Sequence, residues 1–353
     1  MSDISSSDVI KCPSCGANME YSPSEGCLVC PYCKTEKLVD KVPVGEGWDF
    51  KTFDEKGEVP EAGASVYICP NCKAETVVTG FRTAEQCPFC GSTNVISAEN
   101  LQGKKPDCIL PFIVTKDQAV AGSKKWIKNK WFAPTKFKKS FKPEAMKPVY
   151  EPAYAFTSDT ESAYDGRLGE NETRTVGSGE NRRTETYIRW FYVKGTYVKR
   201  FEDMVIEASV HLDQRQMDKI GPFDTANALE YRKEFLAGYV AERPCDSVQK
   251  CFETAKSKMD AEIKRGILNK YSADHVDYLN VYTNHKTIFF KAILYPIYHS
   301  FFAYRGKKYE FFVNGRSGRA SGKTPVSPWK VGIAVLVALA VLVGILYLMG
   351  IFE

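Results

Sequence analysis

Four Cys-Pro-X-Cys pairs constrain what this chain can fold into more than any other feature of its sequence. The pairs are Cys12 with Cys15, Cys30 with Cys33, Cys69 with Cys72, and Cys87 with Cys90. Fourteen residues separate the first pair from the second and the third from the fourth, and the two halves repeat at an offset of 57 residues. Such a repeat indicates two copies of one small folding unit.

Each copy presents four thiols on two tight turns, which is the donor set of a structural zinc site. Four thiolates satisfy tetrahedral Zn²⁺ at a Zn–S distance of about 2.3 Å and leave no position for water or substrate. The spacing is close to that of four-cysteine ribbons, so we expect two structural Zn²⁺ held by these eight cysteines. Sulfur-only coordination also suits rubredoxin-like iron, and the sequence leaves that alternative open.

Cys27 offers a competing pair, Cys27-Leu-Val-Cys30, in the first copy. Only Cys30 with Cys33 reproduces the second copy, which favours Cys30 as the ligand and places Cys27 in a hairpin. Whether Cys27 can replace Cys30 stays open. The first nine residues contain neither a basic start nor an apolar run, so we expect no export signal and therefore reduced thiols.

Residues 105–315 have the pattern of a mixed α+β body with antiparallel strands. Thr115 with Gln118 predicts the capped start of one helix, and Asp246 with Gln249 predicts that of a longer one. Apolar residues of the longer helix recur at helical spacing: Val248, Phe252, Ala255, Met259, Ile263 and Ile267. The segments 149–210 and 276–313 are rich in Tyr, Val, Thr and Phe between Gly turns, which predicts strands.

The end of the chain predicts a membrane helix. Residues 331–352 carry no charge, and at about 1.5 Å per residue they can cross a hydrocarbon core of roughly 30 Å. Lys and Arg dominate the residues before this segment, so the positive-inside tendency keeps the N-terminal body in the cytoplasm of a single-pass protein at the cell membrane. We expect 1–40 as zinc ribbon 1, 41–64 as a linker, 65–100 as zinc ribbon 2, 105–315 as the body, 316–330 as a basic juxtamembrane linker and 331–352 as the transmembrane helix.

Charge argues against nucleic acid as the partner of the ribbons. Residues 1–100 contain eight Lys/Arg and fifteen Asp/Glu, a net charge of −7. Eight thiolates around two Zn²⁺ would add about −4. Because an acidic surface repels phosphates, the ribbons are expected to contact proteins.

A lysine patch follows the ribbons, with nine Lys against a single acid, Glu144. The patch consists of Lys124, Lys125, Lys128, Lys130, Lys136, Lys138, Lys139, Lys142 and Lys147. Aromatic residues alternate with these lysines: Trp126, Trp131, Phe132, Phe137 and Phe141. Three interpretations stay open: a solvated face above core aromatics, a contact with anionic lipid headgroups, and a nucleic-acid contact. The lack of Arg disfavours base-specific recognition.

Evidence for an enzyme is weak. No His lies in a His-Glu-x-x-His frame, and the chain contains neither a Gly-rich phosphate loop nor a nucleophile elbow. We therefore expect no catalytic residues, no small-molecule substrate and no enzymatic activity. An enzyme with a site that carries no motif is a further alternative.

Several segments together resemble a known group of proteins. They are the paired ribbons, Ile109-Leu-Pro-Phe-Ile-Val, the helix with Trp126 and Trp131, and Val313-Asn-Gly-Arg-Ser-Gly. They are similar to bacterial TFIIB-type zinc-ribbon membrane proteins of the YdjG type, which are often loosely labelled PriA-helicase-like. The resemblance covers nearly the whole chain and implies phage-shock-protein-A-like and SPFH-type partners in envelope stress. The helicase label finds no support, because no Walker-type phosphate loop is present.

The sequence as a whole predicts a tail-anchored, cytoplasm-facing zinc-ribbon adaptor or scaffold that recruits protein partners to the bacterial membrane. The alternative is a membrane-tethered nucleic-acid-binding protein that uses the lysine patch. The identity of the partner, the signal and the oligomeric state do not follow from the sequence.

Overall fold

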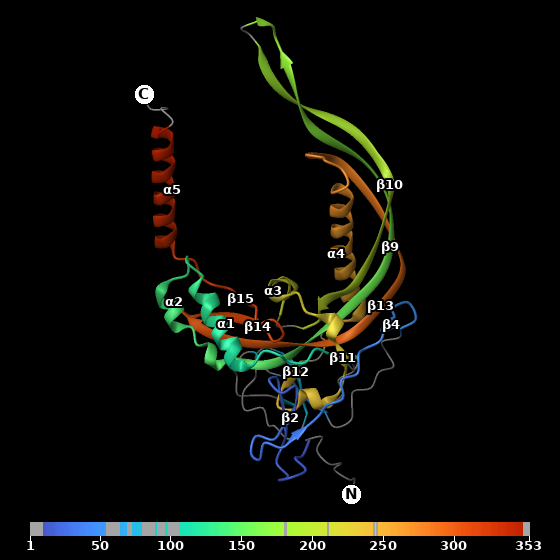
Figure 1. Ribbon diagram of the computed structural model, residues 1–353, viewed down its shortest axis with the longest axis vertical. Coiled ribbons are helices and arrows are strands. Elements are labelled where there is room, and N and C mark those ends of the chain that lie inside the picture. Colours follow the sequence, from blue (N-terminus) through green and yellow to red (C-terminus); the bar gives the residue numbers. More distant parts are fainter. Residues whose placement is uncertain are drawn as a thin grey trace.

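The chain folds into a mixed α+β body with a small cysteine-containing unit on one side and a C-terminal helix on the other (Figure 1). The computed structural model describes residues 10–53, 64–68, 73–79, 89, 96–97, 106–179, 182–209, 212–242, 244 and 246–348. The α+β class and the antiparallel strands predicted from the sequence are confirmed.

Three long strands form the centre of the fold. β9 (Lys147–Val176) pairs antiparallel with β10 (Arg183–Glu207) and with β13 (His275–Tyr304). Residues 149–156 of β9 are buried throughout, whereas from Ser158 to Leu168 only every second side chain is buried. The outer part of the three strands (residues 157–176, 183–206 and 275–288) is called the finger. It curves upward on the right of Figure 1.

Shorter strands extend this sheet. They are β4 (Trp48–Asp49), β5 (Ala64–Ile68), β6 (Glu75–Thr79), β7 (Ile96–Ser97), β8 (Cys108–Ile109), β11 (Leu229–Glu230), β12 (Val240–Glu242), β14 (Lys307–Asn314) and β15 (Ala320–Gly322). The main path of the sheet runs β11-β8-β13-β9-β12-β6-β5-β7. β8 pairs parallel with β13, and β12 pairs parallel with β9.

The helices cover the edges and one face of the sheet. They are α1 (Lys116–Lys128), α2 (Thr135–Ser140), α3 (Gln214–Ile220), α4 (Val248–Leu268) and α5 (Pro328–Leu348), with 3-10 turns at Pro143–Ala145, Thr225–Asn227 and Lys233–Leu236. The capping box of α1 is confirmed, because Thr115 and Gln118 each accept a hydrogen bond from the other's backbone amide. Trp131 lies beyond the end of α1 and is exposed, so its predicted place on the buried face is wrong.

α4 packs its apolar stripe against the concave side of the finger. All six predicted stripe residues are buried, and Cys251 joins them. The predicted start is wrong by one residue: Ser247, whose hydroxyl accepts from the amide of Lys250, caps the helix. Asp246 instead forms an ion pair with Lys250 at 2.6 Å.

Segments expected to be linkers or a separate ribbon belong partly to the body sheet. Within 41–64, β4 pairs with β13, and Phe50 packs 4.5 Å from Phe252, because these aromatic side chains gain more by burial than by exposure. Within 65–100, β6 pairs with β12 of the body. Within 316–330, β15 pairs with β14.

α5 begins three residues before the predicted start of the membrane helix, at Pro328. One helix of the described chain is long and apolar enough to cross a membrane, over Pro328–Leu346, and none of this stretch is buried in the protein. Residues 349–353 lie outside the described residues.

Candidate metal centre

The structure brings four cysteines of the first repeat together. One Sγ atom from each of Cys12, Cys15, Cys30 and Cys33 lies within 4.8 Å of the others. Sγ of Cys12 is 3.4 Å from that of Cys33, and Sγ of Cys15 is 3.5 Å from that of Cys30. Four sulfurs around one zinc at 2.3 Å would lie about 3.8 Å apart, so the cluster fits one metal ion after a small expansion.

Two turns with the same hydrogen bonds present these thiols. In the first, Cys12 N donates to Ala17 O and Gly16 N donates to Cys12 O; in the second, Cys30 N donates to Thr35 O and Lys34 N donates to Cys30 O. Gly16 has the left-handed φ of +73° expected after the second cysteine of a turn. Lys34 adopts the same conformation at φ +62°, although its sequence gives no sign of this. Matching turns therefore place the four sulfurs symmetrically.

Burial and charge also suit a metal-binding cluster. Cys12 and Cys30 are buried, while Cys15 and Cys33 are exposed. Contacts with the side chain and backbone amide of Thr35 lower the pKa of the Cys33 thiol to about 6, and the thiolate is the form that binds metal. Cys27 lies in strand β2, outside the cluster, and burial raises the pKa of its thiol.

The four-cysteine unit is attached firmly to the body. Its strands are β1 (Glu20–Ser22), β2 (Cys27–Val29) and β3 (Glu36–Lys37), which form an antiparallel sheet. Tyr21 N donates to Ala237 O at 2.9 Å, and the Tyr21 ring lies 5.4 Å from that of Phe235. These rings share one hydrophobic core, so the unit is not a freely moving appendage.

The second predicted centre, Cys69, Cys72, Cys87 and Cys90, lies outside the described residues. Phe89, between the last two of these cysteines, is described: its side chain is buried and lies 6.0 Å from the ring of His299. Its carbonyl accepts a hydrogen bond from Lys308 Nζ at 3.2 Å. Phe89 therefore contacts the body directly.

The lysine patch is not a single face. Lys124, Lys125 and Lys128 lie on α1, and Lys136, Lys138 and Lys139 lie on α2, while Lys130 occupies the loop between these helices and Lys142 and Lys147 follow α2. Seven of the nine are exposed, and Lys138 and Lys147 are half-buried. Among the interleaved aromatics, Phe137 and Phe141 are core residues, as one interpretation expects, but Trp131 and Phe132 are exposed.

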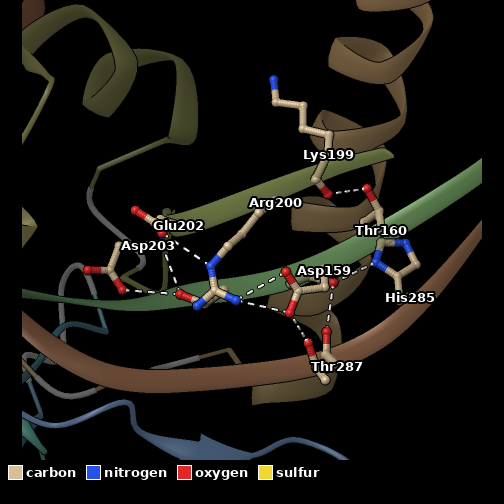
Figure 2. A network of polar contacts seen from close by, with 10 residues as sticks. Asp159, Thr160, Lys199, Arg200, Glu202, Asp203, His285 and Thr287 are labelled. Atoms are coloured by element: carbon tan, nitrogen blue, oxygen red, sulfur yellow. Dashed lines mark hydrogen bonds and ion pairs between the residues drawn. The ribbon is translucent and has the colours of Figure 1, made fainter. Parts of the chain in front are cut away.

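A polar network at the base of the finger was missed by sequence reasoning. The Arg200 guanidinium binds Asp159 at 3.0 and 3.1 Å and Glu202 at 3.1 Å (Figure 2). Hydrogen bonds from Thr287 and Arg200 lower the pKa of Asp159. The network joins all three long strands, and no local sequence pattern signals pairs that lie 41 and 128 residues apart.

A hollow of about 580 Å³ lies beside this network, between β10, α3 and α4. Each of its four cations has a partner: Lys199 with Glu262, Arg200 with Asp159, Lys258 with Asp218, and Arg319 with the Gly221 carbonyl. Because these cations are paired internally, the hollow has the character of a structural ion-pair network rather than of an anion-binding site.

Three carboxyl groups are buried under the centre of the sheet: Glu151 of β9, Glu207 of β10 and Glu242 of β12. Burial raises the pKa of Glu151, and burial together with the nearby charge of Glu151 raises that of Glu207 well above its usual range. The hydroxyl of Tyr295 donates to Glu207. Within the part of the chain that the structure describes, only the four cysteines are close enough together to share a metal ion.

Comparison with known proteins finds one full-length relative. The chain is 26% identical over 325 residues to a protein of Bacillus subtilis (strain 168) named "Uncharacterized protein YdjG", and the match covers 91% of each chain. No protein-family model matches the chain, and no solved structure matches it. The relative supports the resemblance to YdjG, whereas the TFIIB-type ribbon assignment stays a hypothesis.

Proposed function

We propose that this chain is a tail-anchored, cytoplasm-facing zinc-ribbon adaptor that recruits protein partners to the bacterial membrane. In this proposal α5 crosses the membrane and holds the body at its cytoplasmic surface. The first cysteine cluster and its repeat each hold a structural Zn²⁺. Phage-shock-protein-A-like and SPFH-type proteins are the proposed partners in envelope stress, on the strength of the sequence resemblance alone.

The observation that carries the proposal is the separation of two unlike ends. α5 is apolar and unburied on one side of the sheet, while the cysteine unit lies on the opposite side (Figure 1). An anchor at one end leaves the other end directed away from the bilayer. A protein held at a surface raises the effective concentration of whatever its free end binds.

The cysteine unit has features of a binding module. Four sulfurs around one ion leave no open coordination position, so the metal supports the fold and does not act on a substrate. Tyr32, inside the second turn, and Leu38, just after β3, are 80% and 86% exposed. Large apolar side chains exposed on a rigid unit are typical contacts of a protein partner.

The test is crosslinking and affinity capture of the full chain from detergent-solubilised membranes, with and without nuclease. Tyr32→Ala with Leu38→Ala should abolish recovery of specific partners while the zinc content stays unchanged. The matched control is Val198→Ala with Tyr282→Ala, which removes two exposed apolar side chains from the finger. Partners that survive the ribbon substitutions would contradict the proposal, and partners lost with nuclease would favour the nucleic-acid alternative.

A further inference from the structure

The start of α5 is bound to the loop that joins α1 and α2. Lys330 Nζ donates to the carbonyl oxygens of Trp131 at 3.1 Å and Ala133 at 2.8 Å. Ser327 N donates to the carbonyl of Phe132 at 2.8 Å. If α5 enters a bilayer, this loop is therefore the part of the body held closest to the point of entry, whatever tilt the helix adopts.

Exposed aromatic side chains gather at this junction. Trp131 is 62% exposed and Phe132 43% exposed in the loop, and Trp329 is 79% exposed at the first turn of α5. Trp is enriched where a membrane protein meets the headgroup region, because its ring is apolar and its N–H is polar. The loop thus presents the same chemistry as the helix start that it contacts.

Positive charge surrounds these aromatics. Of the nine patch lysines, Lys124 pairs with Glu144 at 2.8 Å, and Glu144 is the one acid in the segment. The other eight lysines therefore give α1, α2 and their loop a large positive excess. Juxtamembrane lysines are attracted to anionic headgroups within about one Debye length of the surface.

The finger fixes which side of the body faces the membrane. It projects in the same general direction as α5 (Figure 1), but it carries ion pairs such as Arg189–Glu170 and Arg174–Glu185 near its tip. Charged groups of this density are excluded from hydrocarbon. A bilayer that contains α5 must avoid the finger, so α5 leans away from it, and the outer side of α1 and α2 turns toward the headgroups.

We propose that α1, α2 and their loop form a binding surface for anionic lipid headgroups, with Trp131 and Phe132 at the membrane interface beside Trp329. The inference rests on the proposed membrane attachment through α5. It adds a second contact that sets the orientation of the body and hence the direction in which the cysteine unit points.

The test is hydrogen–deuterium exchange of the full chain in nanodiscs of neutral phosphatidylcholine or with added phosphatidylglycerol. Amides of residues 129–142 should exchange at least about threefold more slowly in the anionic discs. The triple variant Lys125→Gln, Lys128→Gln, Lys139→Gln should lose this difference. The matched control, Lys194→Gln, Lys256→Gln, Lys264→Gln, changes three lysines that are also exposed but lie on the finger and α4, and it should keep the difference.

Equal exchange in neutral and anionic discs would overturn the proposal. So would slowing by an added single-stranded oligonucleotide in neutral discs without any effect of anionic lipid, which would assign the surface to nucleic acid. A chain that does not enter nanodiscs at all would contradict the membrane anchor itself, so the two failures are distinguishable. All substituted lysines are exposed, and an unchanged thermal midpoint verifies that the variants fold.

Discussion

α4 and α5 contain 21 residues each, yet the rest of the molecule treats them in opposite ways. α4 alternates charged and apolar residues and buries seven side chains in one stripe. α5 is apolar around its whole circumference over Pro328–Leu346, and none of that stretch is buried. The more apolar helix is the one that the protein does not cover.

The difference shows that a helix is buried in a protein by pattern, not by total hydrophobicity. A stripe can be matched by one sheet face, which is what the finger offers α4. A helix that is apolar on every side needs an apolar environment on every side, and a bilayer supplies it. Each prediction below changes one member of this comparison.

Deletion of residues 328–353 should have the largest effect. The body is expected to move from the membrane to the soluble fraction, because the apolar segment is lost, and its thermal midpoint should stay the same, because that segment buries no side chain. Fractionation in high salt, which screens the lysine surface, followed by circular dichroism measures both. Replacing α5 with an unrelated apolar helix is the control and should restore membrane attachment. A deletion variant that still sediments with salt-washed membranes would contradict the anchor.

Cys12→Ser asks whether the first ribbon behaves as part of the core, like α4, or as an appendage, like α5. Loss of one thiolate removes the metal, and structural zinc contributes about 10–16 kcal/mol to folding such units. We expect residues 10–40 to lose protection from exchange and the body to lose a few degrees of thermal midpoint, because Tyr21 packs against Phe235. Zinc analysis and hydrogen exchange measure these effects.

Cys27→Ser is the matched control for Cys12→Ser. Cys27 is equally buried but lies outside the cluster, so its replacement should leave the metal content unchanged. Loss of zinc from Cys27→Ser, or full zinc content in Cys12→Ser, would show that the ligand set differs from the one described.

The same substitution in the two helices gives the third test. Ile263→Ala in α4 removes a fully buried side chain and should reduce the free energy of unfolding by about 2–5 kcal/mol. Ile345→Ala in α5 removes a side chain that is 48% exposed and should change it by less than about 0.5 kcal/mol. Urea unfolding of the full chain in mild detergent, followed by tryptophan fluorescence, compares them. Equal losses would mean that α5 packs against the body.

The sequence predicted features whose signals are local. The cysteine spacing, the capping box at Thr115, the stripe of α4 and the apolar end of the chain each lie within one short segment. It did not predict the parallel pairing of β12 with β9, the docking of β4 on β13, or the network of Arg200 with Asp159. Those contacts join residues that are far apart in the chain, and local periodicity contains no information about which strands meet.

The last comparison concerns charge, because buried titratable groups lie beside α4, whereas α5 has none over residues 331–348. Glu207 lies beside α4, where its carbonyl accepts a hydrogen bond from Cys251 at 3.7 Å. The raised pKa values of Glu207 and Glu151 mean that the folded state holds these protons more tightly than the unfolded chain does. Their contribution to stability is therefore present at low pH and is lost as the pH rises from about 4.5 through the folded-state pKa values.

Glu151→Gln should consequently be more stable than the wild type at about pH 8, by about 1.4 kcal/mol for each unit by which burial raises the pKa. At about pH 4, where the carboxyl is protonated in both states, the two should be nearly equal. Thermal midpoints across this range measure the difference. Glu161→Gln, at an ion pair of the finger with Lys286, is the control and should gain nothing at high pH. A Glu151→Gln variant that is less stable than the wild type at high pH would show that the buried carboxylate is ionised and has a positive partner.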